Sequence, residues 1–237
     1  MMQKKELLYS GKAKSVYKTD DPQLLVIDFR DDASAFNGVK LAKLAGKGQV
    51  NNRINAFLMD YLSNEGINTH HVKCLNKTEE LARHLDMIPV ECVVRNVIAG
   101  SLAKRFGLAE GAQLPEPVFE FYLKDDNLGD PLINESHIHV FGWANEEEVA
   151  IMKQLSLQIN KLLLPLFTAA DLLLVDYKLE FGRYKGELYL GDELTPDGCR
   201  IWDVVSNEKM DKDRFRRDLG EVVKHYRMVA KRLGVKL

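Results

Sequence analysis

The 237-residue chain is poor in cysteine and has no long apolar run, and these two deficits exclude several classes of protein. Its three cysteines, Cys74, Cys92 and Cys199, are an odd number, and no two have the close spacing of a metal knuckle. They predict reduced thiols that pack in the interior, as is typical of cytoplasmic proteins. The longest apolar stretch, residues 162–175, is interrupted by polar residues and is too short to span a bilayer. The first residues hold no apolar segment of signal-peptide length, so we expect a soluble cytoplasmic protein with no membrane partner.

An excess of positive charge is also missing. The 33 Lys and Arg residues are balanced by 35 Asp and Glu residues, which gives a formal net charge of −2. Non-specific binding to nucleic acid depends on a basic excess, so we expect no nucleic-acid partner. Hydrophobic residues make up 46% of the chain and charged residues 29%, which excludes disorder and favours a globular fold. A chain of this length buries roughly 70% of its surface on folding, enough for one large or two small domains.

The order of the sequence patterns predicts the α+β class. Short β-rich runs separated by turn signals fill the first third, and a helical period then begins near residue 49 and stops at Gly66. Ser101 is a predicted N-cap of a short helix that ends at Gly107. The other predicted strands and helices follow in chain order: strands at 15–18, 24–29, 90–96, 118–123, 172–181 and 187–192, and helices at 146–167 and 212–233.

These elements divide into a small β-rich N-terminal lobe and a larger mixed α/β lobe. The β-rich part covers about the first 80 to 100 residues, and no Pro-, Gly- or Ser-rich linker follows it. Two lobes without a flexible linker share an interface, and clefts at such interfaces commonly bind ligands. We therefore expect a ligand cleft between the two lobes.

The clearest candidate for chemistry is the hairpin formed by 172–181 and 187–192. Side chains alternate along a strand, so Asp176, Lys178 and Glu180 share one face. If 184–186 form a three-residue loop, Lys178 pairs with Asp192, and Glu180 and Asp192 become diagonal neighbours. Two carboxylates suit Mg²⁺, which completes its coordination with water and phosphate. The alternative is a solvated sheet face on which the charges only pair with one another.

A second candidate is the run Gly11, Lys12, Ala13 and Lys14, which precedes the first strong strand. Glycine lets the backbone approach a phosphate, and lysines supply compact positive charges. The run does not have the spacing of the strand–loop–helix phosphate motif. It resembles a hairpin loop lying over a nucleotide, and a surface lysine turn is the alternative.

The third candidate is a set of arginines next to small or turn residues. Arg95 comes shortly before Ser101, Arg200 follows a turn, and Arg216 lies at the start of the predicted last helix with Arg214 and Arg217. Arginine near a helix N-terminus opposes the helix dipole, and an anionic ligand would explain that placement. The alternative is that these arginines pair with the nearby aspartates at 211, 213 and 218.

Taken together, these segments resemble the phosphoribosylaminoimidazole-succinocarboxamide synthase family, also called SAICAR synthetase. The resemblance runs nearly from end to end. The matching motifs are GKAK at 11–14, SAFNG at 34–38, GKG at 46–48, VECVVRN at 90–96, AGS at 99–101, KDD at 124–126, DP at 130–131, VDYKLEFG at 175–182, GDELTPD at 191–197, RIWD at 200–203 and DKD at 211–213. Many family members have serine where this chain has Cys199, so a hydrogen bond from that position is not expected here.

The resemblance implies a ligase that uses ATP and Mg²⁺ to join L-aspartate to carboxyaminoimidazole ribonucleotide (CAIR). The expected route phosphorylates the imidazole carboxylate to an acyl phosphate before the amine attacks. It implies a nucleotide-binding lobe at 1–90 and a lobe at 91–237 that carries the metal and ribonucleotide sites. The sequence is compatible with a homodimer.

The resemblance also assigns roles to single residues of this chain. Lys178 and Asp176 would lie at the reacting carboxylate, and Glu180 and Asp192 would bind the metal. The segment around Met87 and Glu91 would be the hinge that meets adenine. The remaining positions fall into two groups: Gly11, Lys12, Ala13, Lys14, Met87 and Lys124 for ATP, and Arg95, Ser101, Arg200 and Arg216 for the ribonucleotide.

Two other function classes fit parts of the pattern. A small-molecule kinase would share the β-rich lobe, the glycine-containing loop and the two metal carboxylates, but it would not need an amine substrate. A non-catalytic nucleotide-binding module would keep the loop without needing Asp176, Lys178, Glu180 and Asp192 together. Measuring ADP release with and without each co-substrate separates the three.

Overall fold

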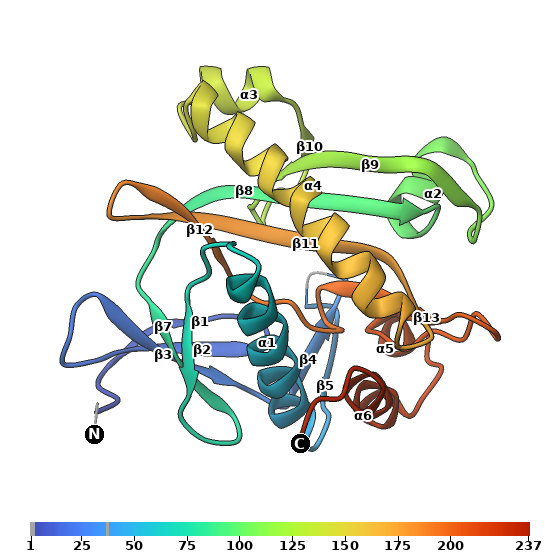
Figure 1. Ribbon diagram of the computed structural model, residues 1–237, viewed down its shortest axis with the longest axis horizontal. Helices are drawn as coiled ribbons and strands as arrows, with labels where there is room; N and C mark the ends of the chain where they lie inside the picture. Colours follow the sequence, from blue (N-terminus) through green and yellow to red (C-terminus); the bar gives the residue numbers. More distant parts are fainter. Residues whose placement is uncertain (1–2, 37) are drawn as a thin grey trace.

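The computed structural model describes residues 3–36 and 38–237 and contains two main antiparallel sheets (Figure 1). Asn37, which belongs to the SAFNG motif, and Met1 and Met2 lie outside the described residues. The first sheet has the strand order β1-β2-β3-β7-β6. Its strands are β1 (Leu7–Ser10), β2 (Lys14–Lys18), β3 (Leu24–Phe29), β6 (His71–Cys74) and β7 (Glu79–Arg83).

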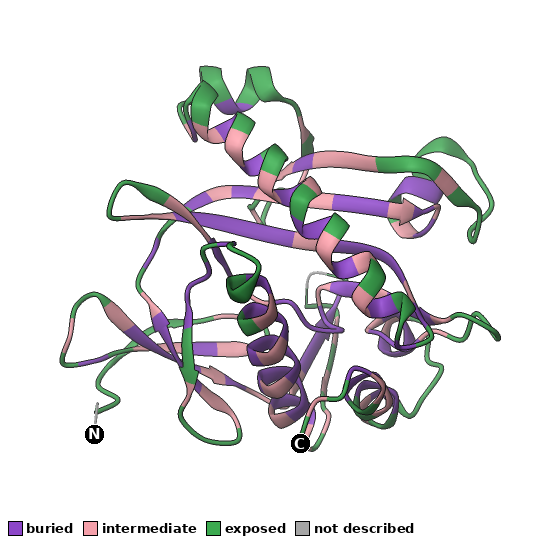
Figure 2. Ribbon diagram, viewed as in Figure 1, coloured by how far each residue is buried: buried purple, intermediate pink, exposed green. Residues whose placement is uncertain are grey.

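A small two-stranded ribbon and a long helix follow the first three strands. The ribbon pairs β4 (Asp32–Ala35) with β5 (Lys40–Lys43). The helix α1 (Lys47–Asn64) confirms the helical period expected from residue 49, and Gly66 follows it with a positive φ. The inner face of α1 is buried, as the purple side of the helix shows in Figure 2.

The second sheet is built around two long central strands. It has the order β10-β9-β8-β11-β12, and β13 pairs with β11 beside β12. Both β8 and β11 are largely buried (Figure 2), because α4 packs across them on one side. The bounds are β8 (Asp86–Val97), β9 (Gln113–Leu123), β10 (Leu132–Ile133), β11 (Leu172–Tyr184), β12 (Glu187–Gly191) and β13 (Cys199–Asp203).

Five further helices complete the fold: α2 (Gly100–Phe106), α3 (Glu135–Val140), α4 (Glu146–Thr168), α5 (Asp213–Arg216) and α6 (Val222–Arg232). The α+β class and the β-rich N-terminal part agree with the sequence prediction. None of the helices in the described residues is long and apolar enough to cross a membrane. Cys92 and Cys199 are buried, Cys74 is half-buried, and all three are free thiols.

Most of the apolar core is one continuous cluster. It includes Ile54 of α1, Val94 of β8, Tyr177 of β11 and Val229 of α6, and it joins the second sheet to the helices α1, α4 and α6. A smaller cluster under the first sheet contains Ile27, whose side chain packs with its neighbours on β3 and β7. The two sheets, which form the walls of the cleft described below, are therefore packed on separate apolar clusters.

The expected last helix at 212–233 is wrong in one respect, because the structure breaks it into α5 and α6. Asp218, Gly220 and Glu221 all have positive φ values, between 50° and 70°, which a right-handed helix cannot contain. The hydrophobic stripe of α6 begins only at Val222. The apolar pattern continues through 212–233 in the sequence, but the backbone turns between α5 and α6.

The expected N-cap of α2 is also wrong. Ala99 occupies the N-cap position with an extended backbone and no side-chain hydrogen bond, and Ser101 lies inside the first turn. The hydroxyl of Ser101 instead accepts a hydrogen bond of 2.8 Å from Arg95 Nη2. The Ser101 hydroxyl therefore binds Arg95 and does not cap the helix.

Candidate functional site

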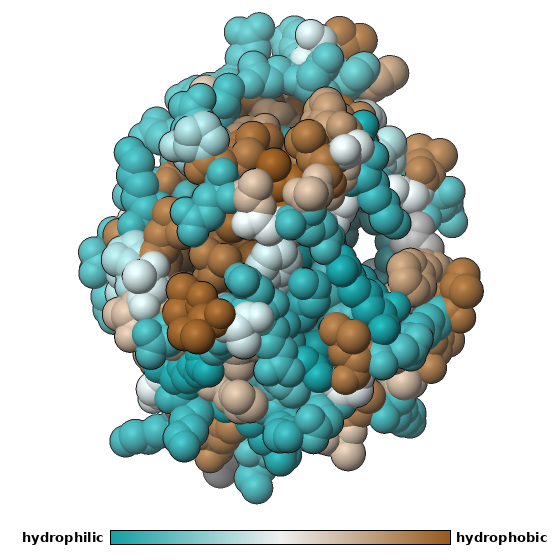
Figure 3. Space-filling view, turned by 90° about the vertical axis from the view of Figure 1, so that its right-hand side faces the viewer, coloured by the Kyte–Doolittle hydropathy of each residue, from teal (hydrophilic) through white to brown (hydrophobic). Residues whose placement is uncertain are grey.

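A cleft of about 750 Å³ lies between the first sheet and the polar face of the second. The loop at 11–14, the strands β8 and β11, the turn after β12 and the helix α5 all contribute to its walls. On the side of the molecule in Figure 3, hydrophilic residues surround the central hollow and apolar residues form separate patches. The cleft therefore combines a polar floor with apolar wall segments.

The polar face of β11 forms the floor of the cleft. Asp176, Lys178 and Glu180 all line it, as the alternation of the strand predicts. The ammonium of Lys178 donates to Glu91 Oε1 of β8 at 2.8 Å and to the carboxylate of Glu180. It also lies 3.5 Å from Asp192 Oδ2. One lysine thus lies among three carboxylates.

The expected register of the hairpin is wrong by one residue. The loop has two residues, Lys185 and Gly186, and both have positive φ values, which is the geometry of a type I′ turn. Glu180 therefore lies opposite Gly191 and not Leu190. A shift of one residue moves the side chains of a strand to the other face, so this register would turn Asp192 away from the cleft.

The left-handed backbone conformation of Asp192 nevertheless brings its carboxylate to the same side as that of Glu180, as predicted. Strand β12 ends at Gly191, and Asp192 follows with a φ of 53°. The turn directs the Asp192 carboxylate back toward Lys178 and Lys14. Positive φ is unfavourable for a residue with a side chain, and such strain is found mainly where a site needs it.

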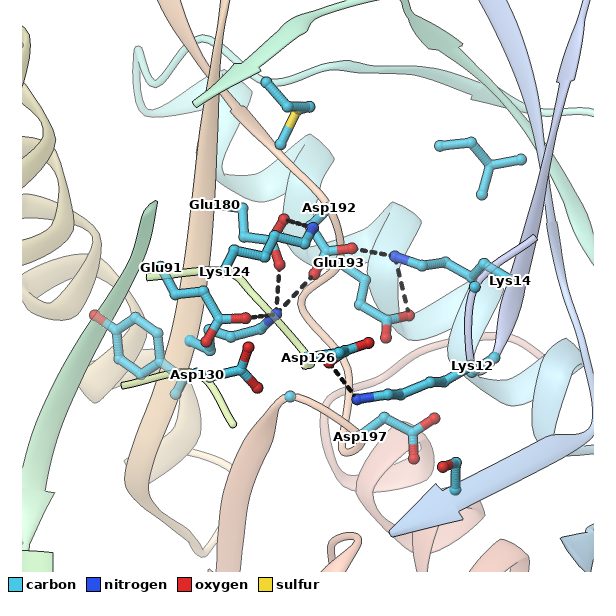
Figure 4. A pocket seen from close by; sticks show the side chains of 18 of the residues that line it. Lys12, Lys14, Glu91, Lys124, Asp126, Asp130, Glu180, Asp192, Glu193 and Asp197 are labelled. Carbon is cyan, nitrogen blue, oxygen red and sulfur yellow. Dashed lines mark hydrogen bonds and ion pairs between the residues drawn. The ribbon is translucent and has the colours of Figure 1, made fainter. Parts of the chain in front are cut away.

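Three lysines neutralise the carboxylates at the centre of the cleft (Figure 4). Lys14 of β2 pairs with Asp192, and Lys124 pairs with Glu180. Burial alone would lower the pKa of Lys178, but Glu180, Asp192 and Glu91 outweigh it and raise that pKa well above its usual value. The same lysines outweigh burial at Asp192 and hold its pKa well below the usual range. Both groups are therefore charged at neutral pH.

The donor set fits a magnesium ion that is held partly by substrate. Glu180 and Asp192 already hold a cation, the ammonium of Lys178, within 4 Å of both carboxylates. A third carboxylate, Glu193, has a buried oxygen, Oε2, without a hydrogen-bond partner, and burial raises the pKa of Glu193. In the described part of the chain, no three acidic, His or Cys side chains form a complete metal site. Mg²⁺ typically uses one or two carboxylates and takes its other ligands from water and phosphate.

The loop at 11–14 bends over the cleft, and all four of its residues line it. The N–H of Gly11 donates to the carbonyl of Lys14 at 2.9 Å, which closes the turn. Arg30 braces the loop by donating to the carbonyl of Gly11 at 2.6 Å. Lys12 reaches across to Asp126 at 2.6 Å. The alternative of a surface lysine turn does not account for Lys14, whose side chain is 17% exposed within the cleft.

The arginines expected to bind an anion meet at one end of the cleft. Arg95 and Arg200 both donate to Asp176 Oδ2, at 2.9 and 2.8 Å. Gly100 lies so close to Arg200 that a Cβ there would lie 2.4 Å from Nη2, and its φ is positive. The cleft wall includes Arg95, Arg200 and Arg216. Ser101 is not part of the wall and is linked to it only by accepting a hydrogen bond from Arg95.

Pairing with nearby acids, the alternative reading of these arginines, is also seen. Asp213 accepts from Arg216 at 2.6 Å and from Arg200 at 3.0 Å. Arg214 does not face the cleft but donates to Glu208 and to backbone carbonyls, and Arg217 pairs with Glu110. The acids orient Arg200 and Arg216 while leaving both in the cleft wall.

Met87 lies at the apolar end of the cleft near the start of β8. The cleft wall here also includes Val16, Leu25 and Leu85. Apolar side chains of this kind suit a flat base. The geometry is compatible with the hinge expected around Met87, while Glu91 lies farther along β8 and contacts Lys178.

The sequence interpretation missed several polar residues of the cleft. Lys212 lines it, and the described residues offer its ammonium no ion-pair or hydrogen-bond partner. Burial lowers the pKa of Lys212. Asp197 also lines the cleft and accepts from the buried Lys47 at 2.6 Å and from Tyr226 at 2.8 Å. Lys47, Asp197 and Lys212 belong to the motifs GKG, GDELTPD and DKD. The spacing of these motifs along the chain does not indicate that the three residues lie close together.

Comparison with known proteins gives one consistent result. Residues 7–233 match the family described as SAICAR synthetase. A phosphoribosylaminoimidazole-succinocarboxamide synthase from Acidithiobacillus ferrooxidans is 58% identical over 236 residues, which cover 100% of this chain and 98% of that protein. The crystal structure of that synthase from Ehrlichia chaffeensis has a TM-score of 0.96 and 43% identity, covering 98% of this chain and 100% of that one. A structure described as SAICAR synthetase (Type-2) in complex with ADP has a TM-score of 0.94 and 41% identity, covering 98% and 99%.

Proposed function

The chain belongs to the SAICAR synthetase family, and from that premise we propose that the cleft between its two sheets is the active site. The protein is an ATP-dependent ligase of purine biosynthesis that joins L-aspartate to the carboxylate of CAIR and releases SAICAR, ADP and phosphate. The observation that best supports the location is the single cleft floor carrying Asp176, Lys178 and Glu180 between the nucleotide loop and the arginines.

We assign the triphosphate to the lysine-rich part of the cleft. Lys12 and Lys14 of the loop and Lys124 would contact phosphate oxygens, with Gly11 and Ala13 allowing close approach. The base would lie against Met87 and the apolar wall. The ADP-bound relative supports use of ATP in this family.

We propose that Glu180 and Asp192 hold Mg²⁺. Bound there with the nucleotide, the ion would neutralise phosphate charge. The chain's own part is to keep both carboxylates ionised and to hold Asp192 in its left-handed turn. Lys14, Lys124 and Lys178 would exchange their carboxylate partners for phosphate oxygens as substrate enters.

The proposed route has two steps. The imidazole carboxylate first attacks the γ-phosphorus of ATP, the bond to the β-phosphate oxygen breaks, and an acyl phosphate forms. The amine of aspartate then attacks the acyl carbon, the C–O bond to phosphate breaks, and the amine loses a proton. Lys178, protonated and 30% exposed at the cleft floor, would stabilise the charge on the transferring group, and Asp176 would orient the arginines beside it.

The ribonucleotide phosphate would bind at the arginine end of the cleft. Two arginines, Arg95 and Arg200, supply planar donors that suit phosphate or carboxylate. The guanidinium of Arg95 also donates a hydrogen bond to Ser101. Arg216 and the ammonium of Lys212, to which residues 3–36 and 38–237 offer no partner, add positive charge on the α5 side. This end thus offers more positive charge than its own acids neutralise.

Three further parts of the proposal concern the location of the protein, its division into lobes and its oligomeric state. We place the enzyme in the cytoplasm, on the basis of its free thiols and its metabolic role. We divide it at 1–90 and 91–237, since the first sheet uses strands within residues 7–83 and the second begins at Asp86. A homodimer is supported by exposed apolar residues such as Val39 and Leu41, which are 86% and 71% exposed.

The first prediction tests the metal assignment. Glu180→Gln or Asp192→Asn should abolish Mg²⁺-dependent turnover while leaving the fold intact, because each removes one of two carboxylates proposed to hold the ion. Turnover is measured as ADP release over a range of Mg²⁺ concentrations, with circular dichroism as the fold control. Near-normal turnover of both variants at ordinary Mg²⁺ contradicts the assignment.

The same assay separates the ligase from the two other function classes. Full ADP release should require both CAIR and L-aspartate. A kinase would release ADP without the amine, and a binding module would release none. Omission of each co-substrate in turn is the control.

A further inference from the structure

Outside the cleft, a carboxylate is completely buried where the first sheet meets α1. Glu80 of β7 has a side-chain exposure of 0% and is not part of the cleft wall. Its Oε2 lies 2.7 Å from His71 Nδ1 of β6. A buried carboxylate needs a charge partner and hydrogen bonds to offset its lost hydration, and His71 supplies the first of these.

The second neighbour of Glu80 is Asn55 in the middle of α1. The amide of Asn55 donates to Glu80 Oε2 at 3.1 Å and to Oε1 at 3.3 Å. With its amide held this way, the carbonyl oxygen of Asn55 points in the other direction. It accepts the backbone N–H of Leu194 at 2.9 Å. Glu80 thereby decides which way the Asn55 side chain faces.

Leu194 lies two residues after Asp192, so this chain of contacts ends at the turn that carries a proposed metal ligand. The start of the turn is held separately, because Leu190 exchanges backbone hydrogen bonds of 2.8 Å with Asn68 and His70. The two attachments hold the turn on both sides of Asp192. Asp192 needs such support, since its φ of 53° is unfavourable by itself.

We propose that Glu80 is a positioning residue for Asp192: it orients Asn55, and Asn55 holds the turn at 191–194 in the conformation that presents the Asp192 carboxylate to the metal. This inference rests on the proposed metal role of Asp192. The groups around Glu80 come from two elements and the residue before one of them: His71 of β6, Asn55 of α1, and His70, whose Nε2 lies 3.9 Å from Oε1 without a hydrogen bond.

The arrangement also explains why a charged group is buried at this position. An apolar side chain of similar size could pack here, but only an acceptor can hold the NH₂ group of the Asn55 amide in place. If that acceptor is lost, Asn55 can rotate and offer its NH₂ group to the N–H of Leu194. Two donors then face each other, and the turn is released.

The test compares Glu80→Ala with Glu80→Gln. The alanine variant should weaken ADP binding in excess Mg²⁺ about threefold to tenfold, the effect of one lost hydrogen bond, and leave ADP binding in EDTA unchanged. Isothermal titration calorimetry with ADP measures both. The Mg²⁺ concentration for half-maximal turnover should rise by the same factor, with kcat at saturating Mg²⁺ changed less than twofold. Glu80→Gln keeps an acceptor for Asn55 and should restore both values to within twofold.

Asn55→Ala provides an independent variant that leaves the Glu80–His71 pair in place. It should reproduce the Mg²⁺ effect of Glu80→Ala, and the double variant should be no worse than either, because both act through one contact. Asn55→Ala alone decides the matter if Glu80→Ala does not fold. Asp60→Asn is the control: Asp60 is the exposed partner of His71, 3.8 Å away, and its loss should leave Mg²⁺ dependence unchanged.

A lower melting temperature without a change in Mg²⁺-dependent ADP binding, or additive effects of the two alanine variants, overturns the positioning role. Asp192→Asn distinguishes this failure from a failure of the proposed metal site. If Asp192→Asn changes the Mg²⁺ dependence and Glu80→Ala and Asn55→Ala do not, only the positioning role is wrong. If Asp192→Asn itself has no effect, the metal site is wrong, and the inference falls with it.

Discussion

At the scale of single residues, Lys178 has the most demanding environment in the cleft. Its ammonium contacts Glu91 and Glu180 and lies near Asp192, and these acids raise its pKa well above the usual value despite burial. A permanently protonated lysine cannot serve as a general base. It can stabilise negative charge that develops during phosphoryl transfer.

We therefore predict that Lys178→Met lowers kcat by about 100-fold or more, with little change in ATP affinity. Lys178→Arg should restore activity only in part, because a planar guanidinium does not replace a compact ammonium among three carboxylates. Steady-state kinetics and a nucleotide-binding titration measure the two effects. Unchanged kcat with weakened ATP binding would mean that Lys178 contacts the nucleotide and that the reaction centre lies elsewhere.

Arg200 is the second residue with a decisive environment. Asp176 and Asp213 hold its guanidinium at 2.8 and 3.0 Å, and they raise its pKa although burial opposes this. The two acids fix the orientation of the side chain before a ligand binds. Preorganisation of this kind lowers the entropy lost on binding.

Arg200→Ala should raise the KM for CAIR roughly 10- to 100-fold, since a charged hydrogen bond contributes about 1.5–3 kcal/mol. The KM for ATP should change much less. Initial rates with each substrate varied in turn provide the measurement, and Arg232→Ala, which removes an arginine paired with Asp203 outside the cleft wall, is the matched control. Equal increases in both constants would place Arg200 outside the ribonucleotide site.

At the scale of elements, α4 supports the sheet that forms the cleft floor. It packs across β8 and β11, and its N-terminus has a capping box. The Asn145 side chain accepts from the Glu148 N–H at 2.9 Å, and the Glu148 carboxylate accepts from the Asn145 N–H at 2.9 Å. Each contact satisfies a backbone donor that the helix itself leaves free.

Asn145→Ala should lower the free energy of unfolding by about 0.5–2 kcal/mol, the usual cost of a lost cap. Because the cap lies away from the cleft wall, kcat and both KM values should stay within twofold of the wild type. Urea unfolding followed by circular dichroism gives the first value. An unchanged free energy would show that tertiary packing of α4 compensates for the cap.

At the scale of the whole molecule, several buried acids and two histidines make stability depend on pH. Burial lowers the pKa of His70, so stability is lost at that residue as pH falls below 6.5. Burial raises the pKa of Asp211 to about 7 from its usual 3.8. Between these values the folded protein holds a proton that the unfolded chain has released, so stability falls as pH rises. At His71, burial is outweighed by Glu80 and the folded pKa is raised above 6.5, so its stabilisation is complete below pH 6.5 and is lost as pH rises through the folded pKa.

Asp192 and Asp213 act at the other end of the pH range. Their folded pKa values are lowered from 3.8, because neighbouring cations outweigh burial. The stabilisation from these carboxylates is present above pH 3.8 and is lost as pH falls toward their folded values. The molecule is thus most stable on the acidic side of neutrality. This range lies above the pH at which Asp192 and Asp213 become protonated and below the pH at which Asp211 and His71 lose their protons.

We predict that the melting temperature falls by at least about 4 °C between pH 5 and pH 8. Asp211 alone costs about 1.4 kcal/mol of stability per pH unit up to its folded pKa of about 7, and about 1 kcal/mol corresponds to 2–4 °C in a chain of this size. Asp211→Asn should be less stable overall, because Asp211 accepts the backbone N–H groups of Ile201 and Asp213. Its melting temperature should vary less with pH. Differential scanning calorimetry across this range checks both, and an equal slope in the two proteins would contradict the raised pKa of Asp211.

The sequence by itself determined the α+β class and the polar face of β11, which forms the floor of the cleft. These depend on local rules: strand alternation places Asp176, Lys178 and Glu180 on one face whatever lies beside them. The end-to-end motif order identified the family, which the comparisons confirm. The roles assigned to the single residues stay predictions.

Only the tertiary structure decided the register of the hairpin, the conformation of Asp192 and the break between α5 and α6. Each depends on backbone dihedrals that are set by packing and turn type, and residue types alone do not specify them: Lys185 and Asp192 both adopt positive φ although neither is glycine. The partnership of Glu80, Asn55 and Leu194 spans 139 residues between Asn55 and Leu194. Contacts so distant along the chain form because separate elements share one core, and no local pattern records them.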